Sequence, residues 1–560
     1  MRVLGVNALF HDPSAALVVD GRVVAAAEEE RFSRRKHGKR PVPFAAWELP
    51  ERAMAWCLEA GGLRPADLDA VAYSFDPALA KPAEEMGLPD PWDWLRVRYA
   101  ERAPQFLAAA LPGLSPAAVR FVPHEVAHAA SAALASPFPV ASVLSLDGRG
   151  ERSSHLAGRY DHGRLEVLAS QELPHSLGLV YESLTEHLGF LRSSDEYKVM
   201  ALASYGEPRF LDDLRELVRA TGDGGFVAEA PDWTRWAPPR TDDGTWGTEH
   251  GGLAEHADLA ASVQVRLEEV LVDLATWLHA QTGDRVLAMG GGTALNCVAN
   301  SRLWRETPFE EVWVQPAAGD SGTALGAAMQ LAAEAGDTVE PMGSAALGRS
   351  WTDDELAARL TTAHVPFTTP ADLPGEVAQA LADDGIVAWF DGRAEFGPRA
   401  LGHRSLLAHP GPVENLERLN DVKGREQFRP VAPMVLEEDA AAIFSGGPVP
   451  SPYMLFVHDV AAEWRDRIPT VVHVDGTARI QTVDGSTPRL QATIRAFKER
   501  TGLPVVVNTS LNTAGRPMVD DPRDALELFG SAPVDLLVLG PHLVRRADLF
   551  AAPADDGGRP

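Results

Sequence analysis

Residues 2–30 read RVLGVNALFHDPSAALVVDGRVVAAAEEE, and this stretch decides the fold. The apolar run at residues 2–8 predicts a buried strand, which ends in a polar loop at residues 10–14. Two further runs rich in β-branched residues meet at Asp20-Gly21, a dipeptide that favours a two-residue hairpin turn. The stretch therefore predicts a strand, a polar loop and a hairpin in succession.

The same plan returns at residues 141–170, which read ASVLSLDGRGERSSHLAGRYDHGRLEVLAS. A hydrophobic strand again ends in polar residues, at Asp147-Gly148, and a hairpin follows with its turn near Asp161-His162-Gly163. A long helix is predicted further on, from Leu253 to Thr282. A unit that occurs twice indicates a duplicated α/β fold. Two such halves that face one another enclose a cleft, which is a usual place for a ligand.

Between the two units lies FVPHEVAHA, residues 121–129, with His124 and His128 four positions apart. On a helix this spacing places both imidazoles on one face, with Cβ atoms about 5–6 Å apart, close enough to share a metal ion. The surrounding alanines favour helix, and Pro123 suits its first turn. Two surface histidines on an alanine-rich helix are an equal alternative. The stretch also matches HExxH, the zinc-protease signature in which Glu125 would activate a metal-bound water.

Two strand–glycine loop–helix patterns follow, at residues 285–303 (RVLAMGGGTALNCVANSRL) and 312–336 (VWVQPAAGDSGTALGAAMQLAAEAG). Such a loop can hold an anion with its backbone N–H groups, although a tight turn is an equal alternative for each. Asp147 follows the strand of the second unit, and Asp320 lies at the bend of the last pattern. Carboxylates complement two imidazoles at a metal, whereas an isolated aspartate is more often a turn or a helix cap. These two carboxylates and the histidine pair are therefore candidates for one metal site.

From about residue 333 to residue 349 the pattern loosens, which indicates a linker. Beyond residue 350 strands and helices alternate without a regular dinucleotide-binding order, and the end, PADDGGRP, resembles a disordered tail. This part concentrates cationic residues in small or apolar surroundings: Arg399, Arg404, Lys423, Arg425, Arg429 and Arg479. In an acidic chain such a cluster indicates an anionic ligand, because guanidinium groups match phosphate oxygens. Ser510 could add a hydroxyl, and ion pairs with nearby carboxylates are the alternative.

Composition narrows the class of protein. The chain has 560 residues, enough for two or three domains with sizeable cores. Its 79 acidic and 51 basic residues give a formal charge of −28, which disfavours nucleic acid as a partner. Cys57 and Cys297 are the only cysteines, so a reducing compartment fits. The sequence shows no signal peptide and no apolar run of about 20 residues, which predicts a cytoplasmic protein without a membrane segment.

The chain resembles the O-carbamoyltransferase family in motifs that follow the family's order over nearly the whole length. They are HDPSAAL, EEERFSRRKHG, PHEVAHAASA, LDGRGE, DEYKVMALASYG, GGGTALNCVAN, PAAGDSGTALGAA, FGPRALGHRSLLAHP, FRPVAPMV, HVDGTARIQTV and NTSLNTAGRPMV. That family includes the tobramycin, novobiocin, cephamycin and bleomycin-type carbamoyltransferases and the nodulation carbamoyltransferases.

The resemblance implies a fold and a two-step reaction. It implies a Kae1-like domain of the duplicated actin/sugar-kinase-like α/β fold at residues 1–335, a linker at residues 336–349 and a YrdC-like α/β domain at residues 350–560. The YrdC-like domain would make carbamoyl-adenylate from carbamoyl phosphate and ATP with Mg²⁺, releasing pyrophosphate and phosphate. The Kae1-like domain would transfer the carbamoyl group to a hydroxyl of a small-molecule acceptor, with a natural-product sugar as the leading candidate, beside Fe(II) or another divalent metal.

The resemblance also implies roles for single residues. The metal ligands would be His124, His128, Asp147 and Asp320, and the catalytic base near the acceptor would be His11. The residues that bind the adenylate in the N-terminal domain would be Lys36, Gly291, Gly292 and Asn296. ATP and carbamoyl phosphate would bind in the C-terminal domain at Arg399, Lys423, Arg429, Arg479 and Ser510.

Three other classes remain as alternatives. A sugar kinase explains the duplicated α/β domain, but not the arginine-rich second domain. A threonylcarbamoyl-type tRNA modification enzyme shares both domain types, yet the charge of −28 disfavours RNA. A non-enzymatic binding protein has no need of both a metal group and a phosphate site. The acceptor and the metal stay open, and a homodimer is possible.

Overall fold

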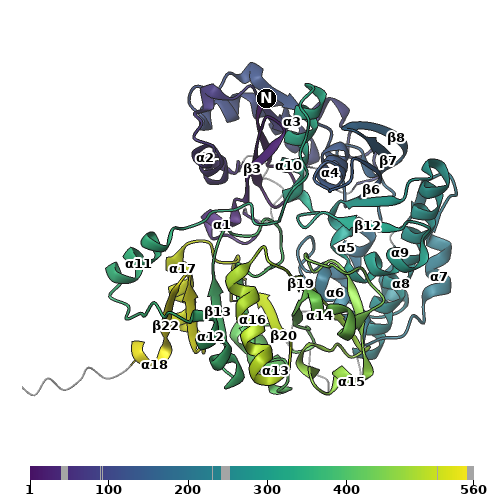
Figure 1. Cartoon of the computed structure of the whole chain (residues 1–560). Helices are drawn as coiled ribbons and strands as arrows, with labels where there is room; N and C mark the ends of the chain where they lie inside the picture. Colours follow the sequence, from purple (N-terminus) through teal and green to yellow (C-terminus); the bar gives the residue numbers. More distant parts are fainter. Residues whose placement is uncertain are drawn as a thin grey trace, which may run out of the picture.

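The computed structural model describes residues 1–38, 48–88, 90, 92–229, 231–240, 253–513 and 515–550. Figure 1 shows an upper and right-hand lobe built from the N-terminal part of the chain (purple to teal) and a lower lobe built from the C-terminal part (green to yellow). Both lobes contain sheets covered by helices, so the chain is an α/β protein, as predicted.

The first sheet has five strands in the order β3-β2-β1-β4-β5. β1 pairs antiparallel with β2 and parallel with β4, and β2 pairs antiparallel with β3. The turn between β2 and β3 is Asp20-Gly21, as predicted, with φ of 50° and 79°, a conformation that Asp-Gly accepts. The strands are β1 (Arg2–Asn7), β2 (Ser14–Val19), β3 (Arg22–Glu28), β4 (Ala70–Tyr73) and β5 (Val119–Phe121).

A second five-stranded sheet repeats this arrangement in the order β12-β11-β6-β7-β8. β6 pairs antiparallel with β7 and parallel with β11, as β1 does with β2 and β4. Its hairpin turns at His162-Gly163, again at positive φ. The same order and directions of pairing confirm the duplicated actin/sugar-kinase-like fold. The strands are β6 (Val140–Leu146), β7 (Ser153–Asp161), β8 (Arg164–Glu172), β11 (Val286–Gly290) and β12 (Glu311–Val314).

Two helices, α4 (His124–Ala133) and α10 (Asp320–Glu334), join the two sheets. α10 packs on the first sheet, α4 packs on the second, and the helices pack on each other through small residues. A Cβ added at Gly326 of α10 would lie 1.8 Å from the carbonyl oxygen of Ala127 in α4. A Cβ added at Gly5 of β1 would lie equally close, 1.8 Å, to the carbonyl oxygen of Ala324. Glycine at these positions therefore allows the helices to lie against each other and against the sheet.

The other helices of this lobe cover the sheets from outside. α2 packs on the first sheet, and α8 and α9 pack on the second. The helix predicted from Leu253 to Thr282 is present as α8 with those bounds. The remaining elements are α1 (Glu30–Ser33), α2 (Glu51–Ala60), α3 (Asp93–Ala110), α5 (Leu177–His187), α6 (Glu196–Ala203), α7 (Leu211–Leu217), α9 (Cys297–Glu306) and the two-stranded sheet of β9 (Val218–Ala220) and β10 (Phe226–Ala228).

The C-terminal lobe is built on a mixed seven-stranded sheet in the order β19-β15-β20-β14-β13-β21-β22. These strands are β13 (Val387–Phe390), β14 (Arg404–Ala408), β15 (Ala432–Leu436), β19 (Gln481–Val483), β20 (Val505–Ser510), β21 (Leu536–Leu539) and β22 (His542–Arg545). A smaller sheet has the order β16-β17-β18, with β16 (Phe444–Ser445), β17 (Val457–Val460) and β18 (Thr477–Arg479).

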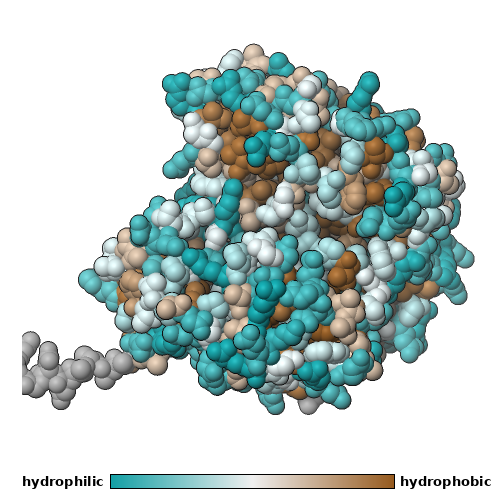
Figure 2. Space-filling view, in the orientation of Figure 1, coloured by the Kyte–Doolittle hydropathy of each residue, from teal (hydrophilic) through white to brown (hydrophobic). Residues whose placement is uncertain are grey.

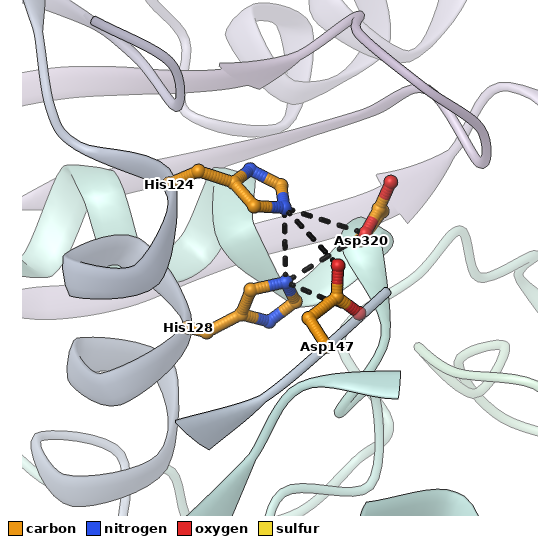
Figure 3. A group of neighbouring side chains, drawn as sticks. All are labelled: His124, His128, Asp147 and Asp320. Carbon is orange, nitrogen blue, oxygen red and sulfur yellow. Dashed lines mark hydrogen bonds and ion pairs between the residues drawn. The ribbon is translucent and has the colours of Figure 1, made fainter. Parts of the chain in front are cut away.

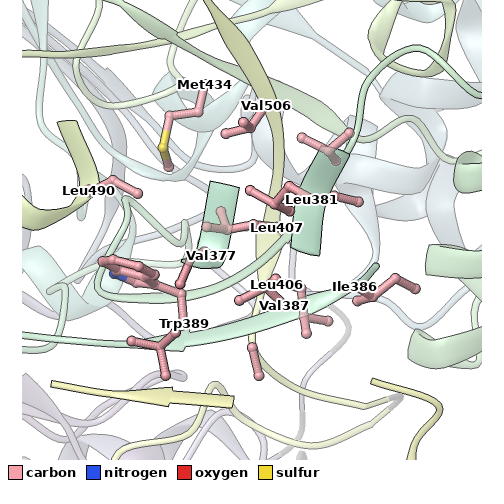
Figure 4. Close-up of a cluster of buried hydrophobic side chains, with 14 of the residues drawn as sticks. Val377, Leu381, Ile386, Val387, Trp389, Leu406, Leu407, Met434, Leu490 and Val506 are labelled. Atoms are coloured by element: carbon pink, nitrogen blue, oxygen red, sulfur yellow. The ribbon is translucent and has the colours of Figure 1, made fainter. Parts of the chain in front are cut away.

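Helices complete the core of this lobe. Figure 4 shows Leu381 of α12 and Leu490 of α16 packed with Trp389, Leu407 and Val506 of the sheet. These apolar side chains are buried, which is the main source of the lobe's stability. The helices are α11 (Asp353–Thr362), α12 (Leu373–Ala382), α13 (Glu414–Lys423), α14 (Glu437–Ile443), α15 (Ala462–Arg465), α16 (Pro488–Thr501), α17 (Pro522–Ser531) and α18 (Arg546–Leu549).

The chain between α10 and α11, which the structure describes throughout, has no helix or strand. It touches both lobes: the Leu347 carbonyl accepts from the Ala26 N–H, and the Gly348 N–H donates to the Ala394 carbonyl. We propose that residues 1–335 and 350–560 form two domains and that residues 336–349 link them.

The surface of the face shown in Figure 2 is largely hydrophilic, with apolar residues gathered on the N-terminal lobe beside the hollow that separates the lobes. Among the described residues, no helix combines the length and the apolar character that a bilayer span requires.

The crossing of α4 and α10 gives a first prediction. Gly326→Ala should lower the free energy of unfolding by about 1–3 kcal/mol, because the added methyl group overpacks a contact between two backbones. Urea denaturation measures this directly. Gly530→Ala is the matched control, because a Cβ at this position in α17 meets nothing within 4 Å. Equal stability of the Gly326→Ala variant and the parent would contradict the close crossing.

Candidate functional site

Helix α4 presents two buried histidines at its N-terminal end. Pro123 is its N-cap residue and His124 begins it, so the predicted helix is present. The rings of His124 and His128 are both 0% exposed, and their Nε2 atoms face each other at 3.2 Å. His124 Nδ1 lies 3.1 Å from the carbonyl oxygen of Ser74. A carbonyl only accepts, so Nδ1 carries the hydrogen and the lone pair of Nε2 points into the group.

Two carboxylates complete this group (Figure 3). Asp147, just after β6, lies 3.7 Å from His124 Nε2 and 3.9 Å from His128 Nε2. Asp320 lies 3.6 Å from both Nε2 atoms. It is the first residue of α10, and a turn at residues 315–319 separates it from β12. One possible ligand atom of each of the four residues lies within 4.8 Å of the other three.

A divalent cation fits this group. Asp320 Oδ1 is buried and has no hydrogen-bond partner among the described residues, which is costly for an ionised carboxylate. Two imidazole nitrogens and two carboxylates are a donor set suited to borderline divalent metals such as Fe(II). The surroundings also orient the donors, because the Gly292 N–H donates to Asp147 Oδ1 at 2.9 Å.

The carboxylates also control protonation. Burial lowers the pKa of His124, but Asp147 and Asp320 raise it well above its ordinary value. Burial raises the pKa of Asp320, but His11, His124 and His128 together hold it below the ordinary value. Protons and a metal therefore compete for these atoms, and metal affinity should fall as the pH falls.

Glu125 does not join the group. Its Oε2 accepts from the Ser145 hydroxyl at 2.7 Å. Burial, followed by the charge of Asp147, raises the pKa of Glu125 to about 8. A zinc protease needs this glutamate to face the metal-bound water, so the geometry disfavours that alternative.

The loop after β1 brings His11 beside the group. Its backbone N–H donates to Asp320 Oδ2 at 3.4 Å, and its Nδ1 lies 2.9 Å from Asp12 Oδ2. Burial lowers the pKa of His11, but Asp320 and then Asp12 raise it to about 10. The other oxygen of Asp12 lies 2.9 Å from His37 Nδ1. Asp12 and His37 lie in the motifs HDPSAAL and EEERFSRRKHG, but no local spacing in the sequence indicates that their side chains meet.

Lys36 and Asn296, expected at the adenylate, have protein partners. Lys36 Nζ lies 3.2 Å from the carboxylate of Glu30. Asn296 caps α9 through its Oδ1 and also exchanges hydrogen bonds with the amide of Gln264. Their adenylate role stays a prediction.

Gly291 and Gly292, the other two residues expected there, shape the turn after β11. Gly291 has a φ of 84°, and a Cβ there would lie 2.1 Å from the carbonyl oxygen of Leu146. The Gly292 N–H is committed to Asp147. This loop therefore orients the carboxylate of Asp147. Its contact with an adenylate stays a prediction.

The C-terminal lobe gathers cationic side chains with few anionic partners. Burial lowers the pKa of Arg399 to about 9, and the charge of Arg479 adds to this effect. Burial and the charges of Arg429 and Arg479 similarly lower the pKa of Arg425 to about 9. The Nε atoms of Arg399 and Arg479 are buried without a hydrogen-bond partner in the described part of the chain. Cations that repel one another in a buried place favour an anionic ligand.

Lys423 and Ser510 lie together at the edge of this cluster. Lys423 Nζ donates to the Ser510 hydroxyl at 3.0 Å and to Asn512 Oδ1 at 2.7 Å. Arg404, in contrast, is a core residue. Its guanidinium lies 3.7 Å from the centre of the Phe390 ring and donates to backbone carbonyl oxygens, so its contacts are structural and are not the ion pairs with carboxylates that were the stated alternative.

The two groups of residues approach each other across the lobes. Burial lowers the pKa of Lys423 well below its ordinary value, and the charge of Lys36 is among the further causes. Helix α6 of the N-terminal lobe also contacts the cationic loop: the Arg429 guanidinium lies 4.7 Å from the centre of the Tyr197 ring, and Lys198 pairs with Glu426 at 2.8 Å. The cationic cluster therefore faces the N-terminal lobe.

A duplicated actin/sugar-kinase-like domain with a buried His/Asp group, next to an α/β lobe with a cluster of partly buried arginines, is the architecture of a two-lobed transferase. The chain belongs to the carbamoyltransferase family: the family model of the carbamoyltransferase N-terminus matches residues 2–115 and 110–329, and that of the carbamoyltransferase C-terminus matches residues 378–546.

The chain is similar to two nodulation proteins and, more weakly, to solved structures. Nodulation protein NolNO of Sinorhizobium fredii is 35% identical over 98% of this chain and 81% of its own length. Nodulation protein U of Bradyrhizobium diazoefficiens is 32% identical over 94% of this chain and 95% of its own. HypF of T. kodakarensis is similar in structure over 60% of this chain and 49% of its own, with 15% identity and a TM-score of 0.38, too low to carry an argument.

The geometry of the His/Asp group gives a second prediction. Asp320→Asn keeps the shape of the side chain but removes its charge, so the variant should bind a divalent metal at least about 10- to 100-fold more weakly than the parent, the range seen for outer-sphere partners of metal ligands. Metal content after dialysis and titration with Fe(II) under anaerobic conditions measure this.

His162→Ala is the control, because this histidine lies in an exposed hairpin turn outside the group. Unchanged metal affinity in the Asp320→Asn variant would remove Asp320 from the set of ligands.

Proposed function

We propose that the protein is an ATP-dependent O-carbamoyltransferase. It makes carbamoyl-adenylate from carbamoyl phosphate and ATP in the C-terminal lobe and transfers the carbamoyl group to a hydroxyl in the N-terminal lobe. The observation that carries the proposal is the pairing of two unlike sites: a cationic cluster with few anionic partners and, in the lobe that this cluster contacts, a buried His/Asp group. A kinase needs only one nucleotide site, whereas a two-step transfer needs both.

The cationic cluster suits the first step. Carbamoyl phosphate and ATP bring several phosphate groups into one place, and the cationic side chains of the cluster offset their repulsion. Each guanidinium group of the cluster would bind two phosphate oxygens, at Arg399, Arg429 and Arg479. Lys423 and Ser510 together would hold a further oxygen. Mg²⁺ accompanies ATP in this step. The products are carbamoyl-adenylate, pyrophosphate and phosphate.

The N-terminal group suits the second step. A divalent cation held by His124, His128, Asp147 and Asp320, either Fe(II) or another metal, would supply Lewis acidity to a carbonyl oxygen. His11 accepts the proton of the acceptor hydroxyl through Nε2, because Asp12 fixes the hydrogen on Nδ1. His11 acts as a base only when the charge of Asp320 is offset, since that charge contributes to its raised pKa.

The orientation of the two sites protects the intermediate. A carbamoyl-adenylate released to solvent would hydrolyse, so direct passage from the cationic cluster to the His/Asp group is an advantage. Lys36, whose charge acts on Lys423 and which Asp12 influences in turn, would contact the adenylate phosphate on its way. For the acceptor we propose a sugar hydroxyl of a natural product.

Carbamoyl phosphate-dependent release of pyrophosphate from ATP tests the proposal. A sugar kinase would instead yield ADP, and a threonylcarbamoyl-forming enzyme would require threonine and bicarbonate in place of carbamoyl phosphate. Absence of carbamoyl phosphate-dependent pyrophosphate release would reject the proposed reaction.

The cationic cluster gives a third prediction. Arg479→Ala and Lys423→Met should each slow pyrophosphate release by an amount equivalent to about 1.5–3 kcal/mol, because each loses a charge-assisted contact with phosphate. Arg418→Ala is the control: this arginine lies on α13 with Lys423 but pairs with Asp384 on the surface. Parental rates in both cluster variants would reduce the cluster to a structural role.

His11 gives a fourth prediction. His11→Asn cannot accept a proton, so carbamoyl transfer should fall by about 10²- to 10⁴-fold while pyrophosphate release continues. Mass spectrometry of the acceptor and of enzyme-bound carbamoyl-adenylate separates the two steps. His162→Asn serves as the control, since asparagine tolerates the positive φ of that turn. A His11→Asn variant with parental transfer would exclude His11 as the base.

A further inference from the structure

Asp12 serves two histidines at once. Its Oδ2 lies 2.9 Å from His11 Nδ1, and its Oδ1 lies 2.9 Å from His37 Nδ1. An ionised carboxylate only accepts hydrogen bonds, so both imidazoles donate through Nδ1. In the neutral imidazole the Nε2 atom of each is then a base. The carbamoyl-transfer proposal uses only one of these bases, His11.

The second base already has a hydroxyl to act on. His37 Nε2 lies 2.6 Å from the Oγ atom of Ser194, so Ser194 donates to the nitrogen that carries the lone pair. Ser194, His37 and Asp12 come from three separate parts of the chain, yet they are arranged as the nucleophile, base and orienting carboxylate of a Ser-His-Asp triad. All three are partly exposed, so a small molecule can reach the hydroxyl.

The backbone around these residues is in an uncommon conformation. Asp12, His37 and Ser193, the neighbour of Ser194, have positive φ of 48°, 60° and 57°. Non-glycine residues rarely adopt this region, and such residues gather where the surrounding structure holds a functional geometry. Ser194 also lies just ahead of α6 (Glu196–Ala203), whose N-terminal end favours developing negative charge.

A second metal site is the competing explanation, because His11, Asp12 and His37 also lie within 4.8 Å of one another. Their contacts do not favour it. Each Asp12 oxygen is already at hydrogen-bond distance from an imidazole Nδ1, and His37 Nε2 is taken by Ser194. A metal would have to replace all of these bonds.

We propose that Ser194 is an activated nucleophile and that it takes up the carbamoyl group before the acceptor does. This rests on the proposed function for the identity of the electrophile, an anhydride of carbamic acid with AMP. The reactivity of Ser194 rests on its geometry alone.

The step balances as follows. Ser194 Oγ forms a bond to the carbamoyl carbon, the bond from that carbon to the phosphate oxygen breaks, and AMP leaves. The serine proton moves to His37 Nε2. In the return step the acceptor hydroxyl attacks the carbamoyl carbon and gives up its proton to His11 Nε2. The bond from that carbon to Ser194 Oγ breaks, and His37 returns a proton to Ser194 Oγ.

A fluorophosphonate probe tests the nucleophile without any assumption about the reaction. The intact chain is incubated with the probe, and the labelled residue is identified by peptide mapping. We expect the label on Ser194, and we expect Asp12→Asn or His37→Asn to slow labelling by about 10²-fold or more, because His37→Asn removes the base and Asp12→Asn removes the carboxylate that fixes its tautomer. Ser193→Ala is the matched control, since that hydroxyl donates to Glu182 and not to a histidine.

Ser194→Ala removes only a hydroxyl from a partly exposed position, and thermal unfolding checks that the variants are folded. Folded parent protein that carries no label on Ser194 would overturn the proposal. Equal labelling rates in the parent and the His37→Asn variant would also overturn it, because a serine that reacts without the histidine is not part of a triad.

The second arm identifies the group that Ser194 takes up. The parent is mixed with ATP and carbamoyl phosphate in the absence of acceptor, quenched in acid and digested. A peptide containing Ser194 that carries one carbamoyl group supports the proposal, and its absence while pyrophosphate is released overturns the carbamoyl assignment. If pyrophosphate is not released, the proposed function fails, and the fluorophosphonate result still decides whether Ser194 is a nucleophile.

Discussion

The close crossing of α4 and α10 is the contact on which the rest of the N-terminal lobe depends. At Gly326 the backbones of the two helices leave no room for a side chain. His124 begins one helix and Asp320 begins the other, so this crossing sets the distance between imidazole and carboxylate. The second sheet is fixed to the same point, because Gly290 of β11 lies against the carbonyl group of His128. Close packing of backbone on backbone thus positions the donors more rigidly than long side chains could.

The two sites carry opposite kinds of electrostatic frustration. Asp147 and Asp320 bring negative charge into a buried place around two histidines, while the partly buried Arg399, Arg425 and Arg479 bring positive charge together in the other lobe. Like charges held together away from water raise the free energy of the protein unless a ligand of the other sign joins them. One site is therefore complementary to a cation and the other to an anion. The overall charge of −28 hides this division.

Local patterns predicted much of the fold. The Asp20-Gly21 turn and the bounds of α8 follow from dihedral preference and helical periodicity, and the four-residue spacing of His124 and His128 brings both imidazoles to one point. Such local patterns cannot predict contacts between loops that lie far apart in the sequence. Nothing local to Asp12, His37 or Ser194 indicates that they meet.

Residue type also misled in one case. Arg404 resembles its cationic neighbours in sequence, but its guanidinium is buried against Phe390 and donates to backbone carbonyl groups. Its role depends on where β14 lies in the sheet, which no spacing in the sequence reveals. The same limit applies to Gly292, whose N–H donates to Asp147 from the turn after β11, far from Asp147 in the sequence.

The contacts of Gly397 bear on whether the two lobes can be separated. Its N–H donates to the Glu28 carboxylate at 2.6 Å, and its carbonyl accepts from the Arg31 guanidinium at 2.7 Å. Both side chains belong to the N-terminal lobe and are buried. If the chain were cut between the lobes, the Glu28 carboxylate and the Arg31 guanidinium would lose their hydrogen bonds to the backbone of Gly397. A charged group that stays buried without such partners is costly. Although each lobe has its own sheet and core, the two are not interchangeable modules, and a partner lobe taken from a relative would have to reproduce the backbone path at this glycine.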